Sequence, residues 1–161
     1  MIVTVRAILV NKNTNQVLLI KHLNEHNALI PAVCSDFWTL PGGIVLNGES
    51  YDETLQRVIF GETGIEHILY KNCVMSRVTC SVAANGENGC HYERYYLAET
   101  DEMEILSALE SEPKEYQWVS FDEMTGEVIF PVSFVSHLES LLKNPVNPID
   151  ITDADEILRF G

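Results

Sequence analysis

The residues from Pro41 to Ile65 constrain the fold of this 161-residue chain more than any other stretch. They open with a glycine pair, Gly42-Gly43, and the segment that follows reads as one helix with recognisable ends. Ser50 is a good N-cap, and Glu53 is placed three residues later to complete a capping box. Gly64 can adopt the left-handed conformation that ends a helix. The stretch therefore predicts a loop, a helix and a second loop as one unit.

Charged residues recur along the same stretch at fixed spacing. Glu49, Arg57 and Glu62 follow the glycine pair in the order G-x5-E-x7-R-x4-E, and a further glycine and an apolar residue close the pattern. The pattern resembles the signature of the Nudix hydrolases, a family that cleaves pyrophosphate linkages in nucleoside diphosphates joined to another group, with a divalent metal ion. Two positions depart from it, because the family has carboxylates where this chain has Val58 and Gly61.

The rest of the chain predicts a sheet with helices on its faces. Segments with strand-like alternation or short apolar runs mark the strands. They cover 2–10, 17–20, 36–40, 69–83, 91–99 and 116–121. A turn at 85–89 joins two of them into a hairpin, and an apolar helical face over 131–142 predicts a second helix. This order fits an α/β domain with a mixed sheet, and it resembles the Nudix α/β/α sandwich.

The chain divides into a Nudix-like domain over 1–143 and a C-terminal extension over 144–161. The extension carries two prolines and several acids, so we expect it to pack loosely. Two segments of the domain allow two interpretations each. Residues 21–34 form either a substrate-contacting loop, as the resemblance implies, or a solvated connector. The acidic residues 101–113 form either a short helix or a loop.

Composition and charge narrow the class of protein. A length of 161 residues and an apolar content of 46% fit one domain with a packed core. The net charge of −14 repels nucleic acid and anionic membranes, so we expect neither as a partner. No signal peptide and no apolar run of membrane-spanning length are visible. The cysteines show no C-x-x-C pair, which argues against a zinc site and predicts free, buried thiols in a reducing cytoplasm. They are Cys34, Cys73, Cys80 and Cys90.

The resemblance implies a magnesium or manganese site on the central helix. Pyrophosphate hydrolysis requires that phosphate charge be neutralised and that a water be activated, and a divalent ion held by carboxylates does both. By resemblance, Glu62 is a metal ligand and catalytic residue, the backbone carbonyl of Gly42 is a second ligand, and Glu49 supports the metal site. Arg57 is expected to orient these carboxylates.

Further site residues are expected outside the helix. By resemblance, a glutamate from a later loop acts as metal ligand or base, and Glu112 suits that role, with Glu115 as the competitor. Basic contacts to the substrate are expected from Arg6 and Lys21, with His22 as another candidate. The resemblance also implies a small nucleotide-type substrate and allows a homodimer.

Each of these residues has a structural interpretation as well. Glu49 and Glu53 are favourable near a helix N-terminus without any metal. Arg57 lies four residues after Glu53, a spacing that suits an ion pair. Glu62 and Glu112 are also explained as exposed acids of an acidic chain.

The two departures from the signature change the metal-binding face of the helix. Val58 extends the apolar stripe of the helix, and Gly61 carries no charge, so the site loses two carboxylates. The stripe consists of Tyr51, Leu55 and Ile59. One or two carboxylates together with substrate phosphates can still hold magnesium, so we expect weak metal binding without substrate. Two functions follow: a pyrophosphohydrolase with a reduced metal site, or a Nudix-fold module that binds a nucleotide or a protein partner.

Overall fold

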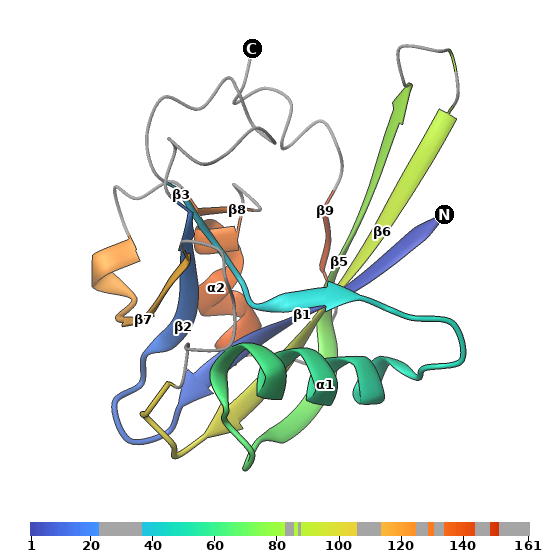
Figure 1. Cartoon of the computed structure of the whole chain (residues 1–161). Helices are drawn as coiled ribbons and strands as arrows, with labels where there is room; N and C mark the ends of the chain where they lie inside the picture. Colours follow the sequence, from blue (N-terminus) through green and yellow to red (C-terminus); the bar gives the residue numbers. More distant parts are fainter. Residues whose placement is uncertain are drawn as a thin grey trace.

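One mixed sheet organises the computed structural model, which describes residues 1–22, 37–82, 86, 88–105, 114–124, 129–130, 134–143 and 149–151. Within these residues the sheet has nine strands, seven of them in the order β8-β3-β2-β1-β6-β5-β9 (Figure 1). The strands are β1 (Ile2–Asn11), β2 (Val17–His22), β3 (Phe37–Thr39), β4 (Gly42–Ile44), β5 (Leu69–Val82), β6 (Asn88–Thr100), β7 (Lys114–Val119), β8 (Ile129–Phe130) and β9 (Ile149–Ile151). The helices are α1 (Tyr51–Thr63), the 3-10 turn η2 (Asp122–Met124) and α2 (Phe134–Lys143).

The central strand β1 has neighbours of both orientations. It runs parallel to β6 over ten residue pairs and antiparallel to β2 and β4. Short β4 pairs with β1 off the main order of the sheet, and β7 pairs in the same way with β2. The predicted mixed sheet is therefore confirmed.

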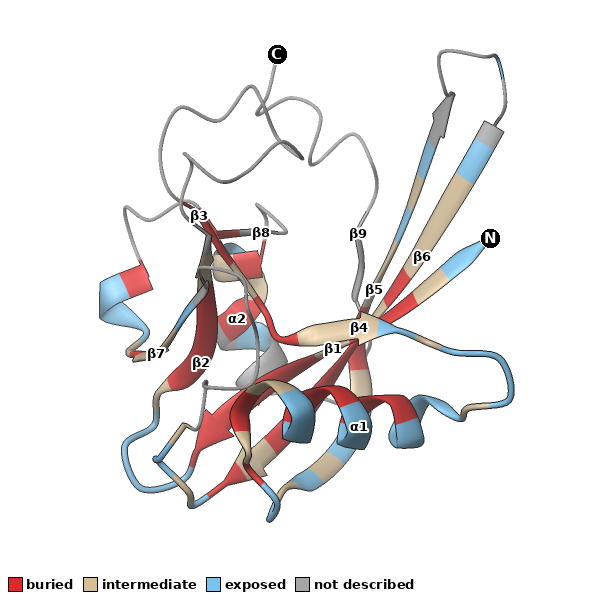
Figure 2. Ribbon diagram, in the orientation of Figure 1, coloured by how far each residue is buried: buried red, intermediate tan, exposed pale blue. Residues whose placement is uncertain are grey.

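Side chains of β1 alternate between two hydrophobic cores, one under each helix. Ile8 faces a cluster that includes Phe134 of α2, whereas Leu9 faces a cluster that includes Leu55 and Ile59 of α1. A strand with both faces buried requires a cover on each side. Figure 2 shows the buried residues concentrated where the strands pass between the helices. The arrangement is the predicted α/β/α sandwich.

The ends of α1 follow from the predicted local signals. Glu53 donates its backbone N–H to Ser50 Oγ at 3.2 Å, and the backbone N–H of Ser50 donates to Glu53 Oε2 at 3.0 Å, which completes the capping box. Gly64 has φ of 74° and donates its N–H to the Phe60 carbonyl at 2.8 Å. The predicted apolar stripe is buried at Leu55 and Ile59, but Tyr51 remains 37% exposed at the helix start.

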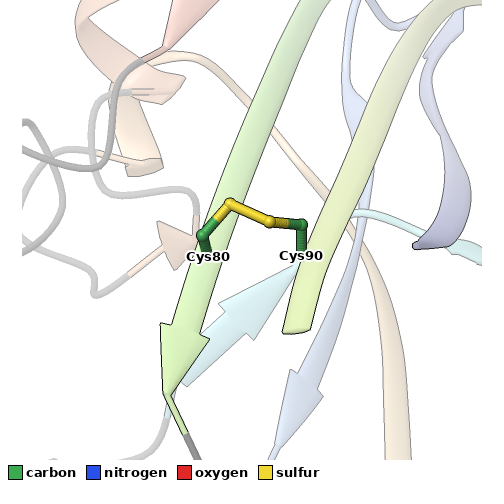
Figure 3. Close-up of a disulfide and its surroundings, with 2 residues drawn as sticks. All are labelled: Cys80 and Cys90. Carbon is green, nitrogen blue, oxygen red and sulfur yellow. A yellow bond between two sulfur atoms is a disulfide. The ribbon is translucent and has the colours of Figure 1, made fainter. Parts of the chain in front are cut away.

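The long hairpin of β5 and β6 corrects the prediction about the cysteines. Its register sets Cys80 directly opposite Cys90, and the two are joined by a disulfide with their Cα atoms 4.1 Å apart (Figure 3). Cys80 is exposed and Cys90 is half-buried. The prediction of free, buried thiols is therefore wrong for this pair, because strand register rather than sequence spacing brings them together. Within the described residues Cys73 is a free thiol, and Cys34 lies outside them.

The C-terminal segments differ from the predicted outline in one respect. β9 pairs in parallel with Met75–Arg77 of β5, so part of the segment 144–161, which we expected to pack loosely, adds a strand to the sheet.

Helix α2 begins at Phe134, within the predicted helix 131–142. Residues 101–105 are not helical, and most of 21–34 and of 101–113 lies outside the described residues. No described helix has both the length and the apolar character needed to cross a membrane.

Alanine at Gly61 inside α1 and alanine at its C-cap Gly64 are expected to change the stability of the fold in opposite directions. Gly64→Ala places a side chain at positive φ and is expected to lower the free energy of unfolding by about 1 kcal/mol. Gly61 lies inside the helix, and a Cβ there would meet no atom within 4 Å. Gly61→Ala is therefore expected to raise the free energy of unfolding by about 0.5 kcal/mol or more. Urea unfolding measures both changes, and two changes of the same sign would contradict the assigned conformations.

Candidate active site

A cleft of about 600 Å³ lies between α1 and the glycine pair of β4. It contains Glu62 and Gly42, two of the predicted metal-binding positions, together with both positions that depart from the signature. The lining residues are Gly42, Gly43, Ile44, Leu46, Arg57, Val58, Gly61 and Glu62. A second hollow of about 670 Å³ on the outer flank of α1 contains neither the glycine pair nor Glu62. The first cleft is therefore the candidate site.

Glu49 and Arg57 form a clamp that fixes the loop before α1. Arg57 Nε lies 2.6 Å from Glu49 Oε1, and its Nη2 donates to Glu49 Oε2 at 3.0 Å and to the Ile44 carbonyl at 3.0 Å. Glu49 Oε2 also accepts the Leu46 N–H at 3.1 Å and the Thr54 hydroxyl at 2.8 Å. Both oxygens of the carboxylate are thus engaged within the loop and helix.

The clamp also sets the ionisation of Glu49. The hydrogen bond from Arg57 is the main cause that lowers the pKa of the Glu49 carboxyl to about 2. Arg57 therefore holds the Glu49 carboxylate, and its partner is Glu49 rather than Glu53, which closes the capping box. Glu49 is not among the residues that line the cleft. Its contacts stabilise the loop before α1.

The backbone of the glycine pair lies against β1 on one side and α1 on the other. A Cβ at Gly42 would lie 2.2 Å from the carbonyl oxygen of Val5, and a Cβ at Gly43 would lie 2.7 Å from Val58 Cγ2. Val58 is 9% exposed, so it packs onto the glycine backbone where the family has a carboxylate. Gly61, in contrast, leaves open space at the cleft wall.

The predicted residues outside α1 are spread over other parts of the domain. Glu112 lies outside the described residues. Its competitor Glu115 is exposed on β7, where it pairs in register with Lys21 of β2. The Nζ atom of Lys21 lies 5.5 Å from the ring centroid of Trp38, and Lys21 is not among the residues of the cleft.

Arg6 of β1 holds the chain just before the glycine pair. Its Nε donates to Glu93 Oε2 at 2.7 Å, and its Nη1 donates to the Leu40 carbonyl at 2.9 Å, just before the glycine pair. Arg77 holds the other oxygen of Glu93. Burial opposes the charge of Glu93, which is only 2% exposed, but the two guanidinium groups outweigh burial and lower the pKa of Glu93 to about 2.

The ion cluster of Arg6, Arg77 and Glu93 was not predicted from the sequence. Its members come from β1, β5 and β6, so the register of three strands brings them together. One available signal was the alternation of β5, which sets Arg77 on the opposite face from Val78 and Cys80. That alternation does not identify Glu93 as its partner.

The family of the chain follows from its sequence match. The family model described as the NUDIX domain matches residues 1–138. The chain belongs to the NUDIX family. No curated protein matches the sequence significantly.

Solved structures of NUDIX proteins share the fold at low sequence identity. The mutator MutT protein from Bacillus halodurans superposes with a TM-score of 0.64 at 20% identity, covering 97% of this chain and 94% of that one. The E. coli dihydroneopterin triphosphate pyrophosphohydrolase gives 0.63 at 16% identity, with 88% and 95% covered. The NUDIX domain of Shewanella oneidensis NrtR, solved with ADP-ribose, gives 0.59 at 17% identity, with 88% of each chain covered.

The residues of the cleft fit a divalent ion only in part. NUDIX proteins generally use such ions, and magnesium prefers oxygen ligands. Glu62 and Gly42 both line the cleft, and they carry a carboxylate and a backbone carbonyl respectively. No three His, Cys, Asp or Glu side chains gather as a metal site within the residues that the structure describes. The donor set therefore suits an ion that shares its coordination with the phosphates of a ligand.

The Glu93 cluster makes an acid-sensitive contribution to stability. The pKa of Glu93 is about 2 in the folded protein and near 4.5 when the chain unfolds, so its contribution is complete above pH 4.5 and is lost as the pH falls towards 2. We expect Glu93→Gln to lower the free energy of unfolding by roughly 3 kcal/mol at pH 6 and by much less near pH 2. Urea unfolding of both proteins across this range measures the difference. A difference that stays constant with pH would contradict the assignment.

Proposed function

We propose that this NUDIX domain cleaves a pyrophosphate linkage in a nucleoside diphosphate derivative, with Mg²⁺ or Mn²⁺ and a reduced metal site. The observation that carries the proposal is the position of Glu62, which lines the same cleft as the Gly42-Gly43 pair. The cleft lies between the two halves of the NUDIX signature, and the clamp of Glu49 and Arg57 keeps that geometry. Among the comparisons, a dihydroneopterin triphosphate pyrophosphohydrolase shares the fold.

In this proposal the residues of the cleft bind the ligand and position the divalent ion. The glycine pair allows the backbone of β4 to approach a ligand closely, because neither residue carries a side chain. Glu62 and the Gly42 carbonyl would hold the divalent ion, which neutralises phosphate charge and activates water when it is bound. With a net charge of −14, the protein needs such an ion to accept a phosphate-bearing ligand. Glu112 remains our candidate for the later carboxylate, and Lys21 for a basic contact to substrate.

A second candidate function is a NUDIX module that binds a nucleotide without cleaving it. Val58 favours this function, because its methyl groups occupy the place of a carboxylate and pack onto Gly43. The NUDIX domain of NrtR, which was solved with ADP-ribose, shows a related fold with a nucleotide ligand. Both candidates place a small nucleotide-type molecule in the same cleft, and they differ in whether turnover follows.

The remaining proposals concern the molecule as a whole. We propose that residues 1–143 form the NUDIX domain and that 144–161 form an extension that adds β9 to the sheet. A cytoplasmic location and a homodimer are also proposed. Duplex nucleic acid and membranes are not proposed as partners, in keeping with the negative charge of the chain.

Metal binding is expected to depend on a phosphate ligand. With ADP-ribose as the probe, Mg²⁺ and probe together are expected to raise the melting temperature by about 5 °C at concentrations far above the dissociation constant, whereas Mg²⁺ alone has little effect. Glu62→Gln keeps the size of the side chain and is expected to abolish the joint shift. Differential scanning fluorimetry measures these changes. A joint shift that survives in Glu62→Gln would contradict the role of this carboxylate.

Turnover distinguishes the two candidate functions. Nucleoside di- and triphosphates, dinucleotides and nucleotide sugars are incubated with Mg²⁺ or Mn²⁺, and phosphate-containing products are measured. The natural protein is expected to act slowly, and Glu62→Gln is expected to lower the rate at least ~100-fold, as loss of a key metal ligand or charge-stabilising group does.

A pair of matched variants makes the result decisive. Val58→Glu/Gly61→Glu restores both carboxylates, and Val58→Gln/Gly61→Gln adds the same bulk without charge. Turnover by the natural protein supports the hydrolase. Turnover by the Glu variant alone supports the binding module and overturns the hydrolase.

A further inference from the structure

The Cys80–Cys90 disulfide lies in a part of the β5–β6 hairpin that extends beyond the two cores. Its two cysteines are respectively exposed and half-buried, and Val78, the next residue towards the core on the same face of β5, is 43% exposed. In Figure 2 the described residues of this hairpin beyond the cores are drawn as intermediate and exposed, away from both helices. A sulfur atom at such a position is accessible to a thiol in solution.

The strand pairing of this part of the hairpin continues on both sides of the disulfide. Thr79 pairs with His91 on one side of the bridge, and Ser81 pairs with Gly89 on the other. Neither cysteine belongs to either hydrophobic core. The disulfide is therefore not needed to close the fold, unlike the bridges that replace a core in small secreted domains.

A line of side chains on one face of β6 leads from the disulfide to helix α1. Cys90, Tyr92 and Arg94 alternate along the strand and so share a face. Arg94 donates from Nη1 to the Tyr92 hydroxyl at 3.1 Å and from Nε to the Tyr96 hydroxyl at 2.9 Å. Its guanidinium carbon also lies 5.0 Å from the ring centroid of Tyr51, the first residue of α1.

Arg94 thus joins Tyr92 of β6 to the start of α1. Arg94 stacks among three tyrosine rings, and such cation–π contacts are strongest when the cation is partly desolvated. Burial opposes the charge of Arg94, but hydrogen bonds to the two tyrosine hydroxyls help to raise its pKa, so it remains a cation. The same charged side chain therefore contacts Tyr92 of β6 and Tyr51 of α1.

We propose that Cys80 and Cys90 form a reversible thiol–disulfide couple that reacts with dithiols and changes the order of the N-terminal turn of α1. In the oxidised form the bridge fixes β6 beside β5, next to Tyr92. In the reduced form the end of the hairpin is held by the backbone ladder alone, and the Tyr92–Arg94–Tyr51 contacts loosen. A bridge of this kind fits a cytoplasmic protein, where disulfides are usually transient or redox-sensing.

The exchange balances with one dithiol as the reductant. A thiolate of the dithiol attacks Sγ of Cys80, the Cys80–Cys90 bond breaks, and Cys90 leaves as a thiolate that takes a proton. The second thiolate of the dithiol then attacks its own sulfur in the mixed disulfide, and Cys80 leaves and is protonated. Two electrons pass to the cysteines, and the dithiol becomes an intramolecular disulfide. The reverse reaction with an oxidised dithiol restores the bridge.

The first arm of the test measures the couple in the folded protein. The full chain is equilibrated in buffers of reduced and oxidised dithiothreitol, and separately with thioredoxin as a protein dithiol. Alkylation of thiols and mass spectrometry then give the fraction of open bridge. We expect reversible titration of both cysteines while the protein stays folded. Reaction with only one reagent would show which kind of dithiol is the source. A bridge that opens only on unfolding would overturn the proposal.

The second arm measures transmission to α1. Amide exchange is followed by NMR at Glu53 and Thr54, whose N–H groups bond to Ser50. We expect several-fold faster exchange at these amides after reduction, and equally fast exchange in Cys80→Ser/Cys90→Ser whatever the buffer. Tyr92→Phe keeps the ring but removes one hydrogen bond, so it is expected to reduce the difference in amide exchange between the oxidised and reduced forms. Arg94→Met is expected to remove that difference. Titration of the bridge without any change at these amides would overturn the proposed link.

Discussion

The close approach of β4 to both of its neighbours is the constraint on which the cleft depends. β4 pairs with β1 at Gly42, where even a methyl group would collide with the β1 backbone, and it presents Gly43 to α1 at contact distance of Val58. The clamp between Glu49 and Arg57 and the brace from Arg6 to the Leu40 carbonyl hold the two ends of this segment. The cleft is thus a backbone-walled space between a strand and a helix, and its shape does not require the carboxylates that the family places there.

The contacts of the arginines bear on the proposed need of this cleft for a cation when it takes a phosphate ligand. Each of the four arginines in the described part of the chain is already engaged. Arg57 is held by Glu49, Arg6 and Arg77 share Glu93, and Arg94 stacks among tyrosines. In the folded protein each of these guanidinium groups already contacts an anion or an aromatic ring. These contacts stabilise the domain, and they leave little unneutralised positive charge for an incoming anion. In the proposed function, a metal ion that arrives with the ligand would supply the missing charge.

Local signals predicted the parts of the fold that local contacts determine. The ends of α1 follow from Ser50, Glu53 and Gly64, each of which bonds to a residue three or four positions away, and both predicted ends were correct. The hairpin shows where such signals stop. The described pairs near its end are symmetric about residue 85, whereas the predicted turn at 85–89 is centred two residues later. A shift of two residues keeps every face but changes every partner, so the faces were right and the disulfide was missed. The ion cluster of Glu93 and the pairing of β9 depend on contacts between distant strands, which no local pattern encodes.

The pairing of β9 has a consequence for how the molecule behaves among its own copies. β5 is a strand of 14 residues, and without β9 its outer side would be an open sheet edge in the described part of the fold. Open edges of this length recruit strands from other molecules and lead to aggregation. β9 covers Met75–Arg77 in the middle of that edge and breaks it into two shorter pieces. Strand β9 thus protects the sheet against aggregation through this edge, a task that is independent of whatever ligand the cleft accepts.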